Sequence, residues 1–412
     1  MIGLVLGTIL ASSTVGGSAF KVVTDNGTLP AAVVSRIVAK WMPSLDSAAP
    51  HDVSLHRVTY PSRDAAGMVR QLTGLVALPA GGAPKGLVIY YHSTTAMKEM
   101  VPSRYTANGG PLEGELTIAA FASAGYAVAA PDYLGLGDDS GIHPYALPSL
   151  NVNSGIDMVA ATRQLGLDRR APIGDALYVT GFSEGGAVAM WTAQALADRT
   201  EPGFRLTAAA PISGAYDVTG TEITSILTGQ SNIKWLAARF YFAGYLGLAL
   251  SSIDPTIQLK DFFSPSFASY IPFAFAHGTN DYDIIRRLAI KGFQLGALRT
   301  IKRSLQAKFV KALEGRDMSN PLVARLAAEN CFDWAPKAPL CLISLERDFL
   351  VPAENARVAI AAMRSRGAGA GVACRVLIKG TRLDHISFAP TGLSLARRFF
   401  DGGFAAVPTV NE

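Results

Sequence analysis

The sequence predicts an α/β protein, with helices on both faces of a mostly parallel, doubly wound sheet and a helical segment inserted late in the chain. Short apolar stretches alternate with helical patterns from 86 to 217, and such alternation is typical of parallel sheets. The alternation stops over 218–334, where several helical patterns occur without a convincing strand pair. It resumes at 335, so we expect the middle segment to be an insertion and not a separate terminal domain.

The chain therefore divides into two parts. Residues 20–217 and 335–412 are expected to form one α/β domain, and residues 218–334 a helical cap on it. With 412 residues, the chain is long enough for a large domain with an insertion of this size.

Residues 1–19 carry a pattern of their own. The apolar stretch Ile2–Ala11 is followed by small residues that end at Ala19, although no Lys or Arg precedes Lys21. This pattern favours a signal peptide, and therefore a secreted or periplasmic protein.

The elements of the α/β domain follow in chain order. Residues 31–41 have a helical pattern, and 56–60 and 69–79 are predicted to form an antiparallel hairpin. The alternating region predicts strands at 86–91, 126–130, 176–179 and 206–212, with intervening helices at 111–124, 154–165 and 187–196. After the cap, we expect strands at 339–345 and 374–378, and helices at 354–366 and 393–400.

Two helices of the cap have recognisable signals. Asn320 followed by Pro321 is typical of a helix start, with an N-cap and then proline at the first helical position. Apolar residues at helical spacing predict a second helix, over Leu298, Ile301, Leu305, Phe309 and Leu313.

One stretch carries a strong chemical signal. A Gly-x-Ser-x-Gly pentapeptide, Gly181 to Gly185, lies between the β-prone segment 176–179 and the helix-forming segment 187–196. The pentapeptide alone is weak evidence, but a sharp strand-to-helix turn is what a nucleophile elbow requires. Such a turn would raise Ser183 above the sheet at the positive end of a helix, which favours a developing anion. The alternative is an ordinary serine in a glycine-rich turn.

A serine hydroxyl needs a base to remove its proton, and the base needs an acid that orients it. On this kind of fold the acid and then the histidine follow the serine along the chain. Of the six histidines, four precede Ser183 and His277 falls in the cap. His385, in the loop after the strand 374–378, is therefore the predicted base.

Two aspartates compete for the role of the acid. Asp348 follows the strand 339–345, at the carboxyl end of a parallel strand, where loops build sites. Asp217 follows the preceding strand and stays open as the alternative, because this fold tolerates an acid on either strand. Asp384 is discounted, because chain neighbours such as Asp384 and His385 seldom face each other as acid and base.

The charge that develops on an attacked carbonyl oxygen needs two backbone N–H donors. The first candidate is the N–H of Glu184, directly after the serine. The second is expected in the loop after the strand 86–91, at Ser93 or Thr94, and Thr94 is preferred. The side chain of Glu184 receives no role beyond a contact at the surface or with residues behind the site.

The elbow, the stretch Asp348–Pro352 and the pair Asp384-His385 resemble the α/β-hydrolase superfamily. The stretches Pro131–Gly137 and Gly141–Tyr145 make the chain similar to its secretory-lipase branch, which includes fungal lipases of the Candida lipase A type and bacterial relatives. The resemblance covers about Gly74 to Phe400. It implies the α/β-hydrolase fold with an inserted helical cap, and ester hydrolysis through an acyl-enzyme. The chain departs from the family pattern in the loop expected to supply the second oxyanion donor. This loop reads His92-Ser93-Thr94, where relatives often have His-Gly.

Aromatic residues gather in the cap, at 240–250 and 262–275. They can be explained by packing of the cap, or by a wall around an acyl chain, where burial contributes about 0.8 kcal/mol per methylene. The candidates for substrate contact are Tyr241, Phe242 and Tyr245. The apolar stretch at 240–250 is too short to span a bilayer.

Charge and cysteines limit the partners. The net charge is +5, and residues 286–316 hold nine Lys and Arg against one acid, Glu314. No nucleic-acid reading motif accompanies this charge, so we expect a solvated helical face, with transient contact to an anionic lipid surface as the alternative. Neither a metal nor a cofactor is predicted, because the cysteines fit no metal-ligand spacing: Cys331, Cys341 and Cys374.

The sequence favours a cofactor-independent serine hydrolase acting on apolar carboxylic esters, either small molecules or lipids. Ser183 would attack the carbonyl, His385 would carry the proton and Asp348 would orient the imidazole. Three alternatives remain. The first is a serine peptidase, although the repeated four-strand units of the propeller that usually precedes such hydrolase domains do not appear before Ser183. The others are a polyester depolymerase and a binding protein of the same fold without catalysis.

Overall fold

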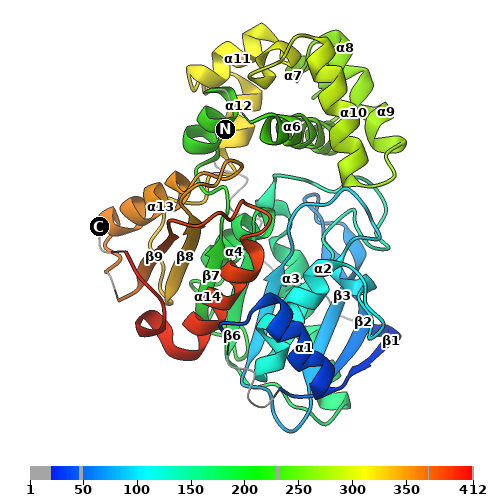
Figure 1. Ribbon diagram of the computed structural model, residues 1–412, viewed down its shortest axis with the longest axis vertical. Coiled ribbons are helices and arrows are strands. Elements are labelled where there is room, and N and C mark those ends of the chain that lie inside the picture. Colours follow the sequence, from blue (N-terminus) through cyan, green and yellow to red (C-terminus); the bar gives the residue numbers. More distant parts are fainter. Residues whose placement is uncertain (1–19, 46–49, 229–231, 370, 411–412) are drawn as a thin grey trace.

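The computed structural model describes residues 20–45, 50–228, 232–369 and 371–410. The predicted signal peptide, residues 1–19, lies outside the described residues. Figure 1 shows two layers of the molecule, with the α/β domain below and the helices of the insertion above it.

The described residues form one nine-stranded sheet with the strand order β1-β2-β3-β5-β4-β6-β7-β8-β9. The first three strands pair antiparallel at one edge, β3 pairs antiparallel with β5, and the rest are parallel. The carboxyl ends of the parallel strands therefore meet at one rim of the sheet, where loops can build a site. The strands are β1 (Lys21–Leu29), β2 (Val53–Arg63), β3 (Val69–Pro79), β4 (Leu87–Tyr91), β5 (Ala127–Pro131), β6 (Leu177–Phe182), β7 (Leu206–Ile212), β8 (Leu340–Leu345) and β9 (Ala373–Ile378).

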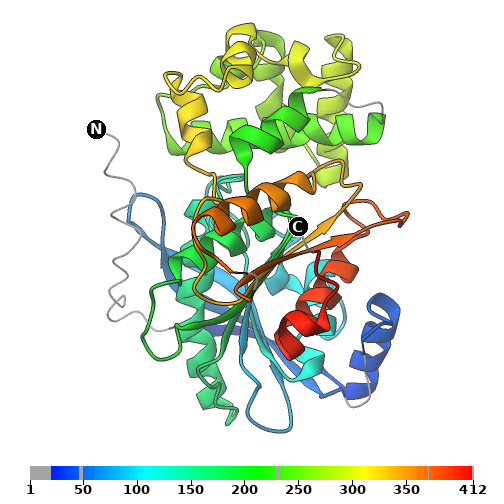
Figure 2. The same cartoon turned by 90° about the vertical axis from the view of Figure 1, so that its left-hand side faces the viewer.

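Helices cover both faces of this sheet, as Figures 1 and 2 show. One face carries α1 (Ala31–Trp41), α2 (Leu112–Ala120) and α14 (Ala389–Gly402), which share one buried apolar cluster. The other face carries α3 (Val152–Asp168), α4 (Glu184–Ala195) and α13 (Glu354–Ser365), which share a second cluster. Short 3₁₀ turns complete the domain: η1 (Pro102–Arg104), η2 (Ala122–Ala124), η3 (Pro148–Leu150) and η6 (Gly403–Ala406).

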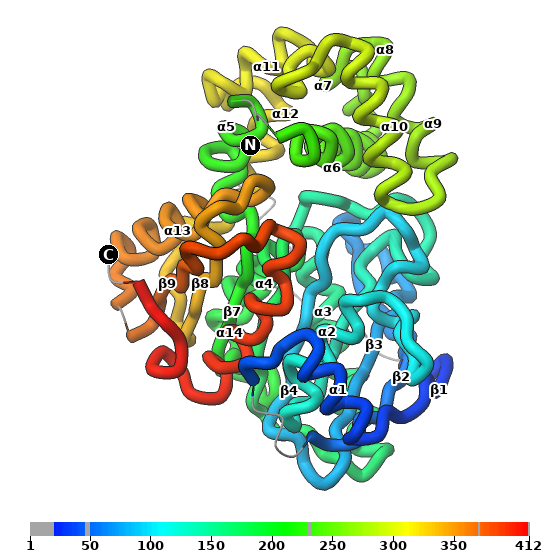
Figure 3. The backbone as a smooth tube through the Cα atoms, viewed as in Figure 1, coloured from blue at the N-terminus to red at the C-terminus, as the bar shows by residue number. Residues whose placement is uncertain are grey.

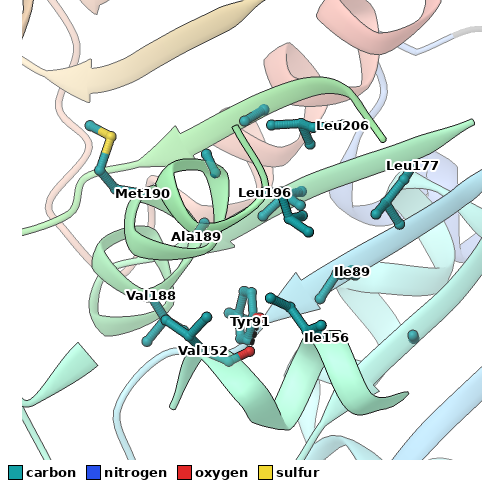
Figure 4. Close-up of a cluster of buried hydrophobic side chains, with 14 of the residues drawn as sticks. Ile89, Tyr91, Val152, Ile156, Leu177, Val188, Ala189, Met190, Leu196 and Leu206 are labelled. Atoms are coloured by element: carbon teal, nitrogen blue, oxygen red, sulfur yellow. Dashed lines mark hydrogen bonds between the residues drawn. The ribbon is translucent and has the colours of Figure 1, made fainter. Parts of the chain in front are cut away.

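The core beneath the site is formed by the alternating side chains of β4 and β6 and the inner faces of α3 and α4. Figure 4 shows Ile89 of β4 beside Ile156 of α3, and Val188 of α4 beside Val152 of α3. Tyr91 is fully buried among them, and its hydroxyl donates to the Val152 carbonyl at 3.0 Å. This packing fixes the end of β4 against the helix that begins after β6.

The described part of the insertion consists of helices joined by loops and has its own apolar cluster. It begins with a π-type turn that follows β7 after a short loop, and Figure 1 shows its helices above the sheet. Its elements are η4 (Val218–Glu222), α5 (Ile223–Thr228), α6 (Ile233–Ile253), α7 (Leu259–Phe262), α8 (Pro265–Ala268), α9 (Tyr270–Ala276), α10 (Asp281–Gln294), η5 (Ile301–Ser304), α11 (Ala307–Glu314) and α12 (Pro321–Ala327).

The chain enters and leaves the cap through one narrow neck, and Figure 3 shows both passages on the same side of the cap. The Cys331 N–H donates to the Tyr216 carbonyl at 2.9 Å. The side chain of Asn330 accepts from the Thr219 N–H at 3.2 Å and donates to its hydroxyl at 2.9 Å. The two connections are therefore bonded to each other before the chain returns to the sheet.

Helix α6 corrects one expectation. The apolar stretch at 240–250 belongs to a helix of 21 residues, Ile233–Ile253, which by length and composition alone could cross a membrane. The prediction that it is too short was therefore wrong. However, 56% of its most apolar window is buried inside the protein, where it packs against α10. A buried helix of a folded domain passes the same test, so this is weak evidence for a membrane span.

Two further expectations were wrong. The first concerns the predicted strands, which did not include β1. This edge strand is mostly exposed and has two register irregularities, so it lacks an alternating apolar pattern. The second is the single helix over Leu298–Leu313, where the structure has η5 and then α11, and Leu298 itself is 68% exposed.

The start of α12 is confirmed, because the Asn320 side chain accepts from the Leu322 and Val323 N–H groups.

Candidate active site

Ser183 lies where β6 turns into α4, at the rim formed by the carboxyl ends of the parallel strands. Its backbone has φ 59° and ψ −117°, a left-handed conformation that is rare for a residue with a side chain. The turn is held by the Ser183 N–H, which donates to the Ile212 carbonyl of β7 at 2.9 Å. The strained turn sets the hydroxyl at the N-terminus of α4, as a nucleophile elbow requires.

The two glycines of the pentapeptide are required by close backbone approach. A Cβ on Gly185 would lie 1.9 Å from the Tyr91 carbonyl oxygen, and one on Gly181 would lie 2.2 Å from the Gly185 carbonyl oxygen. Both distances are far below van der Waals contact. The start of α4 is therefore pressed directly against the end of β4, and the loop after β4 passes beside Ser183.

The structure brings together three of the predicted residues. The hydroxyl of Ser183 is 2.8 Å from His385 Nε2, and His385 Nδ1 is 2.6 Å from Asp348 Oδ2. The side chains of His385 and Asp348 are 5% and 0% exposed. Asp348 Oδ1 accepts from the N–H groups of Leu350 and Val351, at 3.0 and 2.9 Å. These bonds fix the carboxylate, which in turn fixes the imidazole.

The arrangement defines which nitrogen of His385 carries a proton. A carboxylate faces Nδ1, so Nδ1–H donates to Asp348, and Nε2 is left free to accept the Ser183 proton. The ring also stacks on Phe182, with centroids 4.9 Å apart. Such a base can activate a serine hydroxyl and return the proton to a leaving group.

The rival acid, Asp217, does not contact this histidine. Its carboxylate accepts from the Gly220 N–H at 3.0 Å and from the N–H and hydroxyl of Thr221, both at 2.8 Å. It therefore caps the first turn of the insertion. Asp384 likewise faces away, pairing with Lys234 at 2.7 Å. Of the acids considered in the sequence, Asp348 alone is bonded to His385.

The two predicted oxyanion donors belong to neighbouring segments. Glu184 begins α4, so its N–H lies at the positive end of the helix, directly after the serine. In the loop after β4, the Ser93 N–H points to Glu113 Oε1 at 3.4 Å, and the Ser93 hydroxyl donates to the same oxygen. Within the described residues, the Thr94 N–H has no acceptor. The geometry therefore favours Thr94 over Ser93, and the assignment of both donors stays a prediction.

Sequence reasoning missed His143, which pairs with the side chain of Glu184. His143 Nδ1 donates to the Leu134 carbonyl at 2.8 Å, and Nε2 lies 2.9 Å from Glu184 Oε1. The two side chains are 1% and 3% exposed. Because a carbonyl oxygen can only accept, the proton of Nδ1 is fixed on that nitrogen. His143 lies in a stretch that carried the family resemblance. However, His143 and Glu184 are far apart in the chain, and no periodic pattern in the sequence predicts their contact.

Glu222 is a second residue that the sequence did not indicate. It lies on the π-type turn, lines the cavity described below, and accepts from Asn355 Nδ2 at 3.1 Å. Burial raises the pKa of Glu222 to about 7, from an ordinary value of 4.5. The Asp348 carboxylate adds to the rise, while the Asn355 hydrogen bond, Arg239 and His385 oppose it.

An apolar cavity of about 170 Å³ opens at Ser183 and extends into the cap. Its floor includes Ser183, Glu184 and Tyr145 of the α/β domain. The side chains that line it in the cap are mostly aliphatic or aromatic: Ile223, Ile226, Leu227, Phe242, Ala243, Leu246, Phe262, Phe263, Ile301, Leu305, Phe309, Leu313 and Leu326. Of the apolar residues expected on a single helix, all but Leu298 thus reach the cavity, from η5 with its C-cap and from α11: Ile301, Leu305, Phe309 and Leu313.

Of the three residues proposed to contact substrate, Phe242 lines this cavity, whereas Tyr241 and Tyr245 do not. Both tyrosines are buried, at 2% and 3% exposure. The Tyr241 hydroxyl donates to Asp281 at 2.7 Å, and the Tyr245 hydroxyl donates to the Thr95 carbonyl at 3.2 Å. Tyr245 thus joins the cap to the loop after β4, whereas Tyr241 binds Asp281 of the cap, which in turn binds that loop. The assignment of these two tyrosines to substrate contact stays a prediction.

The described residues contain no group of three or more His, Cys, Asp or Glu side chains that could hold a metal ion. The expectation of a metal-free protein stays a prediction. All three cysteines are buried and free. Cys341 and Cys374 face each other across β8 and β9, and burial raises the pKa of the Cys341 thiol well above its usual value. This side chain is therefore kept as a neutral thiol.

The sheet with its antiparallel edge, the elbow after β6, the histidine loop after β9 and the helical insertion after β7 define the α/β-hydrolase fold with a cap. This confirms the predicted fold class. No family model matches the chain, and no curated protein matches it by sequence.

Three proteins serve as examples of the solved structures that share this fold. A protein from Legionella pneumophila thought to be a hydrolase is 24% identical, with a TM-score of 0.76, over 93% of this chain and 97% of that one. The rice cell wall degrading esterase LipA from Xanthomonas oryzae, in a ligand-bound form, is 22% identical, with a TM-score of 0.76, over 93% and 97%. Candida antarctica lipase A is 14% identical, with a TM-score of 0.60, over 87% and 79%. The resemblance read from the sequence is thus confirmed at the level of the fold.

The raised pKa of Glu222 predicts a pH-dependent stability. Its folded-state pKa lies above the unfolded value, so the folded state retains the proton and loses stability as the pH rises from about 4.5 to about 7. We expect Glu222→Gln to match the wild type at pH 4 and to be more stable by up to about 3 kcal/mol at pH 8. Thermal or urea unfolding across this range measures the difference. An equal difference at both pH values would contradict the assignment.

Proposed function

We propose that this protein is a serine carboxylic ester hydrolase that acts through an acyl-enzyme on Ser183. The observation that carries the proposal is the continuous hydrogen-bonded line from Ser183 through His385 to Asp348 at the mouth of an apolar cavity. The esterase LipA and lipase A, which share the fold, act on esters by their names, which supports the same class of reaction here.

The reaction follows from the positions of the groups. Ser183 Oγ attacks the ester carbonyl while His385 Nε2 takes its proton, and Asp348 stabilises the resulting imidazolium. The N–H of Glu184, with that of Thr94, would stabilise the negative oxygen of the tetrahedral intermediate. His385 then gives the proton to the departing alcohol, which leaves the acyl group on Ser183. A water molecule, activated by the same nitrogen, releases the acid and restores the serine.

The cavity favours an ester with an apolar acyl chain. Its lining in the cap has few polar groups, so the amides of a peptide would enter it without hydrogen-bond partners, which is costly. An acyl chain instead gains about 0.8 kcal/mol for each methylene buried. This argues against the peptidase alternative. The aligned histidine and carboxylate argue against a binding protein without catalysis, and a polyester chain with apolar segments remains compatible.

Export and contact with lipid surfaces remain proposals. Tyr282 and Ile290 on α10 and Leu298 beyond its end are 75%, 45% and 68% exposed. Three of the basic residues of 286–316 lie on the same helix, Arg286, Arg287 and Lys291, although Asp283 pairs with the first two. Exposed apolar side chains beside cations suit a transient contact with anionic lipids.

The function is tested by removing the nucleophile. We expect Ser183→Ala to abolish hydrolysis of p-nitrophenyl esters and labelling by a fluorophosphonate, because no other hydroxyl lies against His385 in the described part of the chain. The fold should persist, and circular dichroism checks this. Full activity in the folded variant would overturn the proposal.

The identity of the acid is tested by a matched pair of substitutions. Asp348→Asn should lower kcat by about 10³–10⁴-fold, because an amide does not stabilise the imidazolium and favours the wrong tautomer. Asp217→Asn should change kcat only a few-fold, since Asp217 caps the insertion and does not contact His385. The reverse order of effects would assign the acid to Asp217.

The cavity predicts a dependence on acyl length. Leu313 lines the cavity from α11, which Figure 1 shows at the top of the cap, far from the sheet. We expect Leu313→Trp to fill the far end and lower kcat/KM for long-chain p-nitrophenyl esters about tenfold or more, while butyrate hydrolysis stays unchanged. Met318→Trp, at an exposed position of the same cap that does not line the cavity, is the control. Equal losses for short and long chains would indicate misfolding and contradict the prediction.

A further inference from the structure

We propose that Asp281, on the cap helix α10, is a positioning residue for the second oxyanion donor. It binds the loop after β4 at the two residues that follow Thr94, and so holds the Thr94 N–H in place. This inference rests on the proposed ester hydrolysis, and it assigns to the cap a role in the chemistry beyond enclosing the substrate.

Asp281 makes three hydrogen bonds with its two carboxylate oxygens. Oδ2 accepts from the Thr95 hydroxyl at 2.7 Å, while Oδ1 accepts from the Ala96 N–H at 2.9 Å and from the Tyr241 hydroxyl at 2.7 Å. Thr95 is 6% exposed. Hydrogen bonds to a carboxylate are about twice as strong as those between neutral groups, so this is a firm attachment.

A second contact from the cap fixes the same residue. The Tyr245 hydroxyl donates to the Thr95 carbonyl at 3.2 Å, and its ring stacks on Tyr145 at 4.7 Å with the planes 6° apart. The Thr95 hydroxyl also accepts from the Met97 N–H at 3.0 Å. The carbonyl and the side chain of Thr95 are thus both held, and its peptide plane cannot rotate freely.

The other side of Thr94 is held by the α/β domain. Glu113 binds the N–H and the hydroxyl of Ser93, and the Tyr91 carbonyl lies against Gly185 at the start of α4. Between these anchors stands Thr94, whose N–H has no acceptor within the described residues. A donor that is free but fixed from both sides is suited to an oxyanion, since its stabilisation needs no reorganisation during the reaction.

The consequence is a link between cap docking and reactivity. Asp281, Tyr241 and Tyr245 all belong to the cap, so a displaced cap would release one side of the loop. A donor is effective only within about 2.7–3.1 Å of the oxyanion, and a 1 Å displacement can lower the rate about 10²-fold. The second donor is therefore complete only when the cap is seated on the α/β domain.

The experiment compares Asp281→Ala with Asp283→Ala. Both remove an acidic side chain from the first turn of α10, but Asp283 pairs with Arg286 and Arg287 and does not contact the loop. For each variant, kcat and KM are measured on a p-nitrophenyl ester and on its thiono analogue, in which sulfur replaces the carbonyl oxygen. Sulfur is a weaker hydrogen-bond acceptor, so an intact oxyanion hole favours the oxygen ester.

We expect Asp281→Ala to lower kcat on the oxygen ester by about 10–10³-fold with little change in KM, and to reduce the oxygen-to-sulfur preference. Asp283→Ala should leave both within about twofold, and Asp281→Asn should recover part of the loss. Equal losses on both esters, or no loss on either, would overturn the proposal, since a purely structural role does not distinguish oxygen from sulfur.

Two further variants decide the matter if Asp281→Ala fails to fold. Tyr241→Phe and Thr95→Ala each remove one hydrogen bond to Asp281, and each should reduce the oxygen-to-sulfur preference several-fold. An unchanged preference in both would reject the inference. Failure of the proposed function would give a different result. The wild type would then neither hydrolyse the esters nor react with a fluorophosphonate at Ser183.

Discussion

The close approach of two backbone segments at the elbow is the constraint on which the rest of the site depends. The Tyr91 carbonyl at the end of β4 lies where a side chain of Gly185 would begin. This contact brings the loop after β4 beside the N-terminus of α4, so that donors from two separate segments can face one carbonyl oxygen. It also sets the strained backbone of Ser183, whose hydroxyl then points towards the loop after β9. Without glycine at these positions, neither the nucleophile nor its donors could take up this arrangement.

Much of the site could be predicted from the sequence, because topology orders its parts. Ser183 was marked by a pentapeptide between a strand and a helix, His385 by its place after the last strand, and Asp348 by its place after β8. In a parallel sheet, residues that follow neighbouring strands meet at one rim whatever their separation in the chain. The structure brings these three together, and the catalytic roles given to them remain predictions.

The rest could not be predicted, because it depends on packing between segments that have no common pattern. The sequence of a helix does not show whether an aromatic side chain lines a cavity or makes a hydrogen bond elsewhere. It therefore could not show that Phe242 lines the cavity while Tyr241 and Tyr245 bind other residues. The pairing of His143 with Glu184 and the burial of Glu222 arise only after folding. The edge strand β1 was not predicted because its residues are mostly exposed on both faces, so apolar and polar residues do not alternate along it.

The neck of the cap has a consequence for how such proteins can diversify. Because Tyr216 and Thr219 on the way in are bonded to Cys331 and Asn330 on the way out, the intervening polypeptide is a closed excursion from the sheet. The entropy of closing such an excursion grows only slowly with its length. The cap can therefore be lengthened, shortened or exchanged without a change in the sheet that carries Ser183, His385 and Asp348. A different cap would line the cavity with different side chains and so select a different substrate.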